Sequence, residues 1–151
     1  DFPTLGVDLA RGPATAARDR GLTVQIQPFG LQRALAIRDH RGRQGIIFAN
    51  HVLAHVADVA DVLSGIAALL DEHRGVAMVE VQYLPDLLVN NGFDLVYHEH
   101  RNFFSLSSLE QAALETEVSE QQAQLRRKEE EELLARERVL RQKGPQLAPE
   151  H

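Results

Sequence analysis

Four side chains capable of acid–base or hydrogen-bond chemistry lie together in the run Tyr97-His98-Glu99-His100. An imidazole gains or loses a proton near neutral pH, and a neighbouring carboxylate can fix which ring nitrogen carries that proton. The phenol adds a hydroxyl group that can donate or accept a hydrogen bond. The run therefore predicts a site at which a proton is moved to or from a bound molecule.

A second polar cluster lies earlier in the chain, where Asn50, His51 and His55 follow the apolar run of residues 45–49. The two histidines could belong to the same site as the later run. They could equally be ordinary polar side chains at the junction between a strand and a helix. The sequence leaves both interpretations open.

A metal site is the chemical alternative for the histidines, with the ligands His98, Glu99, His100 and His55. Two ligands separated by one residue, without a clear third, support such a site weakly, so no metal is expected. In a straight strand, successive side chains point to opposite faces. Tyr97, Glu99 and His100 can therefore converge only if the chain bends at this run.

The elements that must position these residues alternate regularly between strand and helix patterns. Short apolar or alternating runs predict strands at residues 4–8, 22–27, 45–49 and 75–81. Helical spacing predicts helices at residues 13–20, 31–41 and 59–70, the last with Asp58 as its N-cap. This alternation indicates an α/β fold in which residues 4–82 form a parallel sheet of at least three strands.

Polar side chains follow three of these predicted strands, namely Asp8, Asn50 and Glu80. In open parallel α/β sheets, ligands bind beside the carboxyl ends of the strands. We therefore expect a ligand site along this edge of the sheet.

The chain changes character near residue 110, so we predict an α/β domain at residues 1–109 and a charged helical tail at 110–151. Both lysines lie in the last third, and no aromatic residue follows Phe104. Ser107 or Ser108 can cap one long helix over residues 108–142, which carries a thin apolar stripe of Leu114, Val118 and Leu125. The acidic run at residues 129–132 is typical of a solvated helix face.

The composition excludes several classes of function. The net charge of −6 argues against a general binder of nucleic acid. The absence of cysteine excludes disulfides, thiolate zinc sites and a cysteine nucleophile. No run approaches the roughly 18 apolar residues of a membrane span, so we expect no membrane partner and a cytoplasmic location.

Two motifs resemble the S-adenosylmethionine-dependent sugar C-methyltransferases, which methylate a carbon beside the keto group of nucleotide-linked deoxysugars in antibiotic pathways. They are Ala49-Asn50-His51-Val52-Leu53-Ala54-His55 and Phe93-Asp94-Leu95-Val96-Tyr97-His98-Glu99-His100, the latter followed by Phe104-Ser105-Leu106. Position 51 is commonly Asn in that family, and position 104 is often Tyr. The resemblance covers about residues 4–112.

The resemblance implies a Rossmann-like class I methyltransferase sheet and the cofactor S-adenosylmethionine. It implies that Asp8 accepts hydrogen bonds from the cofactor ribose and that Asn50 also belongs to the cofactor site. It gives proton abstraction from the sugar carbon to His100. Tyr97 and Glu99 would then steady the enolate or the substrate hydroxyls, with His55 in the same site.

The resemblance also implies that the chain is a partial domain. The Gly-rich turn after the family's first strand, its cysteine-rich module and its C-terminal domain have no counterpart in these residues. We therefore expect weak or absent cofactor affinity in this chain alone. The rival hypothesis is a non-enzymatic α/β remnant whose C-terminal helix mediates self-association or binds a partner.

Overall fold

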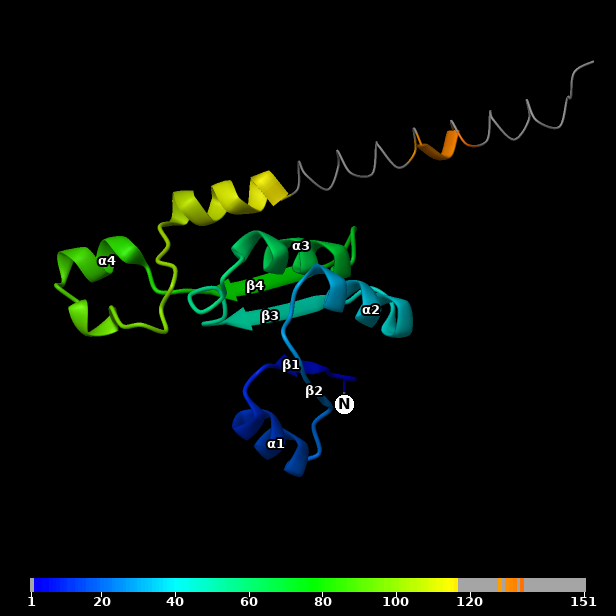
Figure 1. The fold of residues 1–151 in the computed structure, drawn as a ribbon, viewed down its shortest axis with the longest axis horizontal. Helices are drawn as coiled ribbons and strands as arrows, with labels where there is room; N and C mark the ends of the chain where they lie inside the picture. Colours follow the sequence, from blue (N-terminus) through cyan, green and yellow to red (C-terminus); the bar gives the residue numbers. More distant parts are fainter. Residues whose placement is uncertain (1, 117–127, 129, 133, 135–151) are drawn as a thin grey trace, which may run out of the picture. The chain divides into compact units, whose positions relative to one another are not determined.

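The computed structural model describes residues 2–116, together with residues 128, 130–132 and 134. The chain divides into two compact units, residues 1–116 and residues 117–151. All elements described below belong to the first unit (Figure 1).

Strands and helices alternate along the first unit, as the sequence predicts (Figure 1). The strands are β1 (Gly6–Asp8), β2 (Val24–Ile26), β3 (Ile46–Asn50) and β4 (Val76–Glu80). The helices are α1 (Arg11–Asp19), α2 (Leu31–Arg41), α3 (Val59–Leu69) and α4 (Leu84–Val89), followed by a 3₁₀ turn (Phe93–Leu95) and a helix at residues 106–116. The short parallel strands confirm a mixed α/β fold, which agrees with part of a Rossmann-like domain.

All four strands are paired and parallel, but they form two separate sheets instead of the single sheet predicted. β1 pairs with β2 across helix α1, and β3 pairs with β4 across helix α3. Each pair is thus closed by its own crossover helix, whereas α2 joins one pair to the next. Within the described residues, β1 and β3 do not pair with each other.

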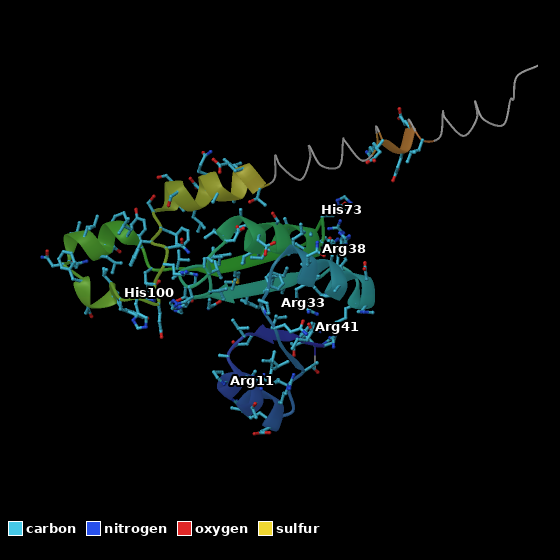
Figure 2. All side chains as sticks on the ribbon, viewed as in Figure 1. Arg11, Arg33, Arg38, Arg41, His73 and His100 are labelled. Atoms are coloured by element: carbon cyan, nitrogen blue, oxygen red, sulfur yellow. The ribbon has the colours of Figure 1, made fainter. Side chains whose placement is uncertain are left out.

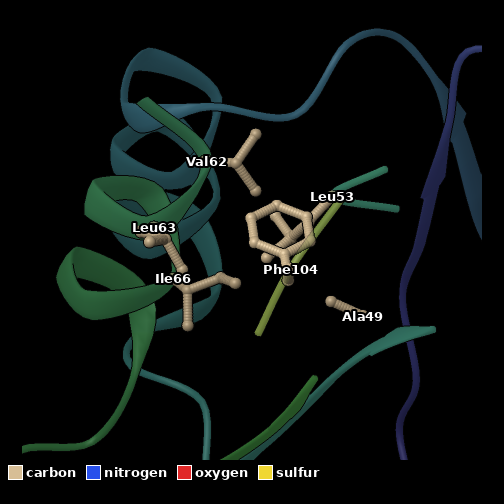
Figure 3. Close-up of a cluster of buried hydrophobic side chains, with 6 residues drawn as sticks. All are labelled: Ala49, Leu53, Val62, Leu63, Ile66 and Phe104. Atoms are coloured by element: carbon tan, nitrogen blue, oxygen red, sulfur yellow. The ribbon is translucent and has the colours of Figure 1, made fainter. Parts of the chain in front are cut away.

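The main core lies between the β3–β4 sheet and α3. Leu53 is fully buried there, and the ring of Phe104 packs among apolar side chains of α3 (Figure 3). Burying a side chain of this size stabilises the fold by roughly 1.5–3 kcal/mol. The core therefore ties the loop after β3 to the segment that contains His100.

A second, smaller core links the two sheets. Ala34 and Ile37 of α2 and Leu69 of α3 are buried, and Val7 of β1 and Ile47 of β3 pack against them. Both sheets thus share the support of α2 and α3.

The two faces of the β3–β4 sheet differ. Ile47, Ala77 and Val79 pack against the core on the α3 side. On the opposite face, Ile46, Phe48, Val76 and Met78 are 63%, 67%, 55% and 55% exposed. Successive residues of a strand alternate between faces, so these four form one bare apolar face in cross-strand register.

Helix α3 begins as the sequence predicts, because the Asp58 carboxylate accepts a hydrogen bond from the Asp61 backbone N–H at 2.9 Å. The Asp61 carboxylate in turn accepts from the Leu31 N–H at 3.1 Å, at the start of α2. The two helices approach closely at Gly30 and Gly65, where a Cβ on Gly65 would lie 2.8 Å from the Gly30 carbonyl carbon.

The helix at residues 106–116 is capped by Ser105, so the predicted cap at Ser107 or Ser108 is wrong. The Ser105 hydroxyl accepts from the Ser108 N–H at 3.1 Å, and the Ser108 hydroxyl accepts from the Ser105 N–H at 3.0 Å. The Ser105 side chain thus satisfies one backbone N–H of the first turn, as an N-cap does.

This helix packs against the main core through Leu109 and Ala112, and Thr116 is buried. Leu114 of the predicted apolar stripe is exposed instead. Val118 and Leu125, and most of the predicted long helix, lie outside the described residues. Within the described part of the chain, no helix is long and apolar enough to cross a bilayer.

Candidate active site

The segment that contains Tyr97 and His100 is a turn, which supplies the bend that the sequence requires. The His100 N–H donates to the Tyr97 carbonyl at 3.0 Å, directly after the 3₁₀ turn at Phe93–Leu95. The turn places both side chains on the same side. In Figure 2, His100 lies beyond the end towards which β3 and β4 run, away from the labelled arginines Arg33, Arg38 and Arg41 of α2.

Tyr97 and His100 form a hydrogen-bonded pair. The Tyr97 hydroxyl lies 2.9 Å from His100 Nε2, and His100 Nδ1 lies 2.8 Å from the Leu95 carbonyl oxygen. A carbonyl only accepts, so Nδ1 must carry a proton and Nε2 of the neutral ring accepts from the phenol. The pair therefore presents Nε2 as a proton acceptor.

Burial divides this pair into an inner and an outer group. His100 is only 8% exposed, whereas Tyr97 is 42% exposed. Their ring centroids are 4.1 Å apart. The phenol is thus the solvent-facing part of the pair.

His55 joins the same cluster from the loop between β3 and α3. Its ring centroid lies 4.9 Å from that of His100, and its Nδ1 donates to the Glu99 carbonyl at 3.0 Å. The Asn102 side-chain amide donates to the Leu53 and Val56 carbonyls at 2.9 and 2.8 Å. The loop and the His100 segment are therefore held together by backbone groups on both sides of His55.

The carboxylate of Glu99 does not reach this ring cluster. Its contact among the described residues is with His98 Nε2 at 3.9 Å, and both side chains are well exposed. Glu99 contributes its backbone carbonyl to His55 instead. Among the described residues, no group of three or more His, Cys, Asp or Glu side chains is arranged to hold a metal ion.

A second polar cluster lies at the carboxyl ends of β3 and β4. Asn50 Nδ2 donates to Glu80 Oε2 at 2.7 Å, and His51 Nε2 lies 3.1 Å from Glu80 Oε1. Asn50 and Glu80 are directly opposite each other in the pairing of β3 with β4, which places their side chains on the same face of the sheet. The sequence predicted only that Glu80 lies at the end of a strand. Its contacts with Asn50 and His51 follow from the register of β3 and β4, which the sequence does not reveal.

Asp8 ends β1 and lies at the surface, as expected. Its Oδ1 accepts from the Ala10 N–H at 2.7 Å, which shapes the turn into α1. Within the described residues, its other carboxylate oxygen has no partner. One carboxylate oxygen of Asp8 therefore stabilises the turn, and among the described residues the other remains open to a hydrogen-bond donor.

Two site features carry no signal in the sequence. The Leu95 carbonyl fixes the His100 tautomer, but any residue could supply a backbone carbonyl. The second is Asn102, whose amide donates to two backbone carbonyls, 49 and 46 positions earlier in the sequence. Both depend on tertiary structure.

Comparison with known proteins identifies a family and a relative of this chain. A family model described as a methyltransferase domain matches residues 2–117. The C-methyltransferase NovU of Streptomyces niveus is 40% identical over 105 residues, which cover 70% of this chain. The matched part spans 25% of the length of that relative.

Proposed function

This chain belongs to the methyltransferase-domain family, and from that membership we propose that its protein transfers a methyl group from S-adenosylmethionine to a carbon atom. The relative named above is a C-methyltransferase, and the chain aligns with a quarter of it. The substrate proposed is a nucleotide-linked keto-deoxysugar, as the two sequence motifs suggest.

The strand-end residues suit this cofactor. The ribose of S-adenosylmethionine donates through hydroxyl groups, and Asp8 keeps one carboxylate oxygen without a partner among the described residues. The Asn50 amide nitrogen donates to Glu80, so its carbonyl oxygen remains an acceptor for the cofactor. When bound, the cofactor supplies an electrophilic methyl group to the substrate carbon and leaves as S-adenosylhomocysteine.

His100 is the proposed base, and the single observation that supports it best is its fixed tautomer. The Leu95 carbonyl holds the proton on Nδ1, so Nε2 carries the lone pair of the ring, which accepts from the Tyr97 hydroxyl in the free protein. Nε2 would take the proton from a substrate carbon beside a keto group. The electron pair of that C–H bond becomes the enolate, which is the nucleophile for methyl transfer.

Tyr97 is the proposed partner of the enolate oxygen. In the free protein its hydroxyl donates to His100 Nε2 at 2.9 Å. When the substrate arrives, the hydroxyl would turn to the keto oxygen and leave Nε2 facing the carbon. A hydrogen bond to developing charge lowers the barrier more than it stabilises the bound substrate.

His55 and Glu99 have supporting parts in this proposal. His55 lies against the His100 ring and keeps its own Nε2 as an acceptor for the substrate. The Glu99 carboxylate is exposed and would meet a substrate hydroxyl from the solvent side.

Solvent-hydrogen exchange at the substrate carbon tests this proposal, because exchange reports deprotonation without methyl transfer. In the whole protein with a nucleoside-diphosphate-linked keto-deoxysugar, His100→Gln should lower turnover and exchange by roughly 10²-fold or more. Tyr97→Phe should slow exchange less, because the base remains. His98→Gln is the matched control, since its ring is exposed outside the cluster.

Normal exchange in the His100 variant, with loss in the His98 or His55 variant, would show that the base is another histidine. The rival hypothesis of a non-enzymatic remnant has less support, because the family match covers most of the chain. Self-association through residues 110–151 remains a separate proposal, and tail-deleted protein would test it.

A further inference from the structure

We propose that His51, oriented by Glu80, binds a hydroxyl group of the substrate and thereby helps to select which sugar the enzyme accepts. This inference rests on the proposed function and assigns a specificity role to a pair outside the His100 cluster. Glu80 acts through His51 and Asn50, so it is a positioning residue.

Glu80 is held at three points by Asn50, the last residue of β3, and by His51, which follows it. Its two carboxylate oxygens lie 3.1 Å from His51 Nε2 and 2.7 Å from Asn50 Nδ2. Its backbone carbonyl accepts from the His51 N–H at 2.9 Å. Because both carboxylate oxygens face groups of the protein, this carboxylate orients its neighbours instead of serving as a free ligand group.

The carboxylate fixes the hydrogen-bonding character of His51. A bare lone pair on Nε2 would repel a carboxylate oxygen at 3.1 Å, so Nε2 carries a proton. In the neutral ring this is the only ring N–H. Nδ1 is then an acceptor, and in the described part of the chain it has no partner. An acceptor selects a donor, so this position suits a hydroxyl group and disfavours a keto oxygen or a phosphate.

His51 lies close in the sequence to His55, which the proposal places beside the substrate. It begins the loop that carries His55 against the His100 ring. The proposed ribose ligand Asp8 lies in the other sheet, at the end of β1. A molecule with its reactive carbon at His100 therefore meets this loop, and the His51–Glu80 pair lies on the strand pair that leads into it.

The backbone at His51 makes a clean experiment possible. Its φ of 56° lies in the left-handed region, which Gly adopts freely and which Asn and His tolerate better than most residues. His51→Gly therefore removes the ring without straining the turn. His51→Asn keeps an acceptor oxygen in the same backbone conformation and serves as the conservative rescue.

The first test uses a keto-deoxysugar nucleotide and analogues that each lack one ring hydroxyl. Wild-type protein should prefer the parent over one analogue by roughly tenfold in kcat/KM, the scale of one hydrogen bond. His51→Gly should abolish that preference mainly through KM, and His51→Asn should restore part of it. An unchanged preference in the Gly variant would overturn the proposal.

Measuring hydrogen exchange at the substrate carbon tests the proposed function separately from the role of His51. At saturating parent sugar, wild-type protein should support exchange, and His100→Gln should lower it by roughly 10²-fold or more. If exchange requires His100 but His51→Gly leaves the sugar preference unchanged, the role of His51 is wrong and the proposed function stands. If wild-type protein does not support exchange either, the proposed function is also wrong.

The second test reads the tautomer of His51 directly, by ¹⁵N NMR of the imidazole in the full chain without ligand. Wild-type protein should show a proton on Nε2. In Glu80→Gln the amide oxygen can keep the Asn50 contact, so the amide nitrogen faces His51 and the proton should move to Nδ1. A proton on Nδ1 in wild-type protein would contradict the proposed orientation.

Discussion

At the scale of single residues, Asn102 connects the two halves of the His100 cluster. Its amide donates to the Leu53 and Val56 carbonyls, which flank His55 in the sequence. Asn102→Ala leaves both carbonyls without this donor, so we expect a loss of roughly 1–3 kcal/mol in the free energy of unfolding and lower turnover. Chemical denaturation and kcat measure the two effects.

Asn90→Ala is the matched control, because the Asn90 amide also donates to a backbone carbonyl, that of Asp86, at the end of α4. This variant should keep turnover and lose less stability. Equal effects of the two substitutions would show that Asn102 has no special part in placing His55.

The sequence could identify the chemistry of single residues but not their partners. An imidazole and a phenol three positions apart cannot meet in a straight strand, and the hydrogen bond between Tyr97 and His100 confirms the predicted bend. The partner carboxylate of His51 depends on the register of β3 and β4. A pairing across about 30 positions leaves no local pattern.

At the scale of elements, the contact between α2 and α3 depends on two glycines. A Cβ on Gly65 would lie 2.8 Å from the Gly30 carbonyl carbon and 2.9 Å from its oxygen. Backbone cannot move aside as a side chain can, so Gly65→Ala should lower the free energy of unfolding by about 1–3 kcal/mol. Thermal or chemical denaturation measures the change.

Gly12→Ala in α1 is the control, since a Cβ at Gly12 has no heavy atom within 4 Å. Alanine favours the helix there, and we expect up to about 1 kcal/mol of added stability. A Gly65→Ala variant as stable as the Gly12→Ala variant would mean that the two helices separate at little cost.

Periodic elements were predictable, whereas short or tertiary ones were not. The helices α2 and α3 follow their apolar spacing, and the Asp58 cap is confirmed. Helix α4 has only six residues, too few to show a period. The Ser105 cap lay hidden because Ser107 and Ser108 offer the same chemistry a few positions on.

At the scale of the whole first unit, the alternation of elements predicted the class of fold but not the division into two sheets. Direction and sequence of the strands follow from local patterns and short crossovers. Which strands share an edge depends on the packing of α2 and α3 beneath them. That packing is a property of the assembled core.

The exposed apolar face of the β3–β4 sheet should promote aggregation of the purified polypeptide, because exposed apolar surfaces associate in water. Phe48 is 67% exposed and lies beside Met78. Phe48→Thr should reduce concentration-dependent light scattering and the fluorescence of a hydrophobic dye, with little change in melting temperature. Ile47→Thr, on the covered side, should instead lower the melting temperature; if both variants scatter like wild type, another surface governs the solubility of this protein.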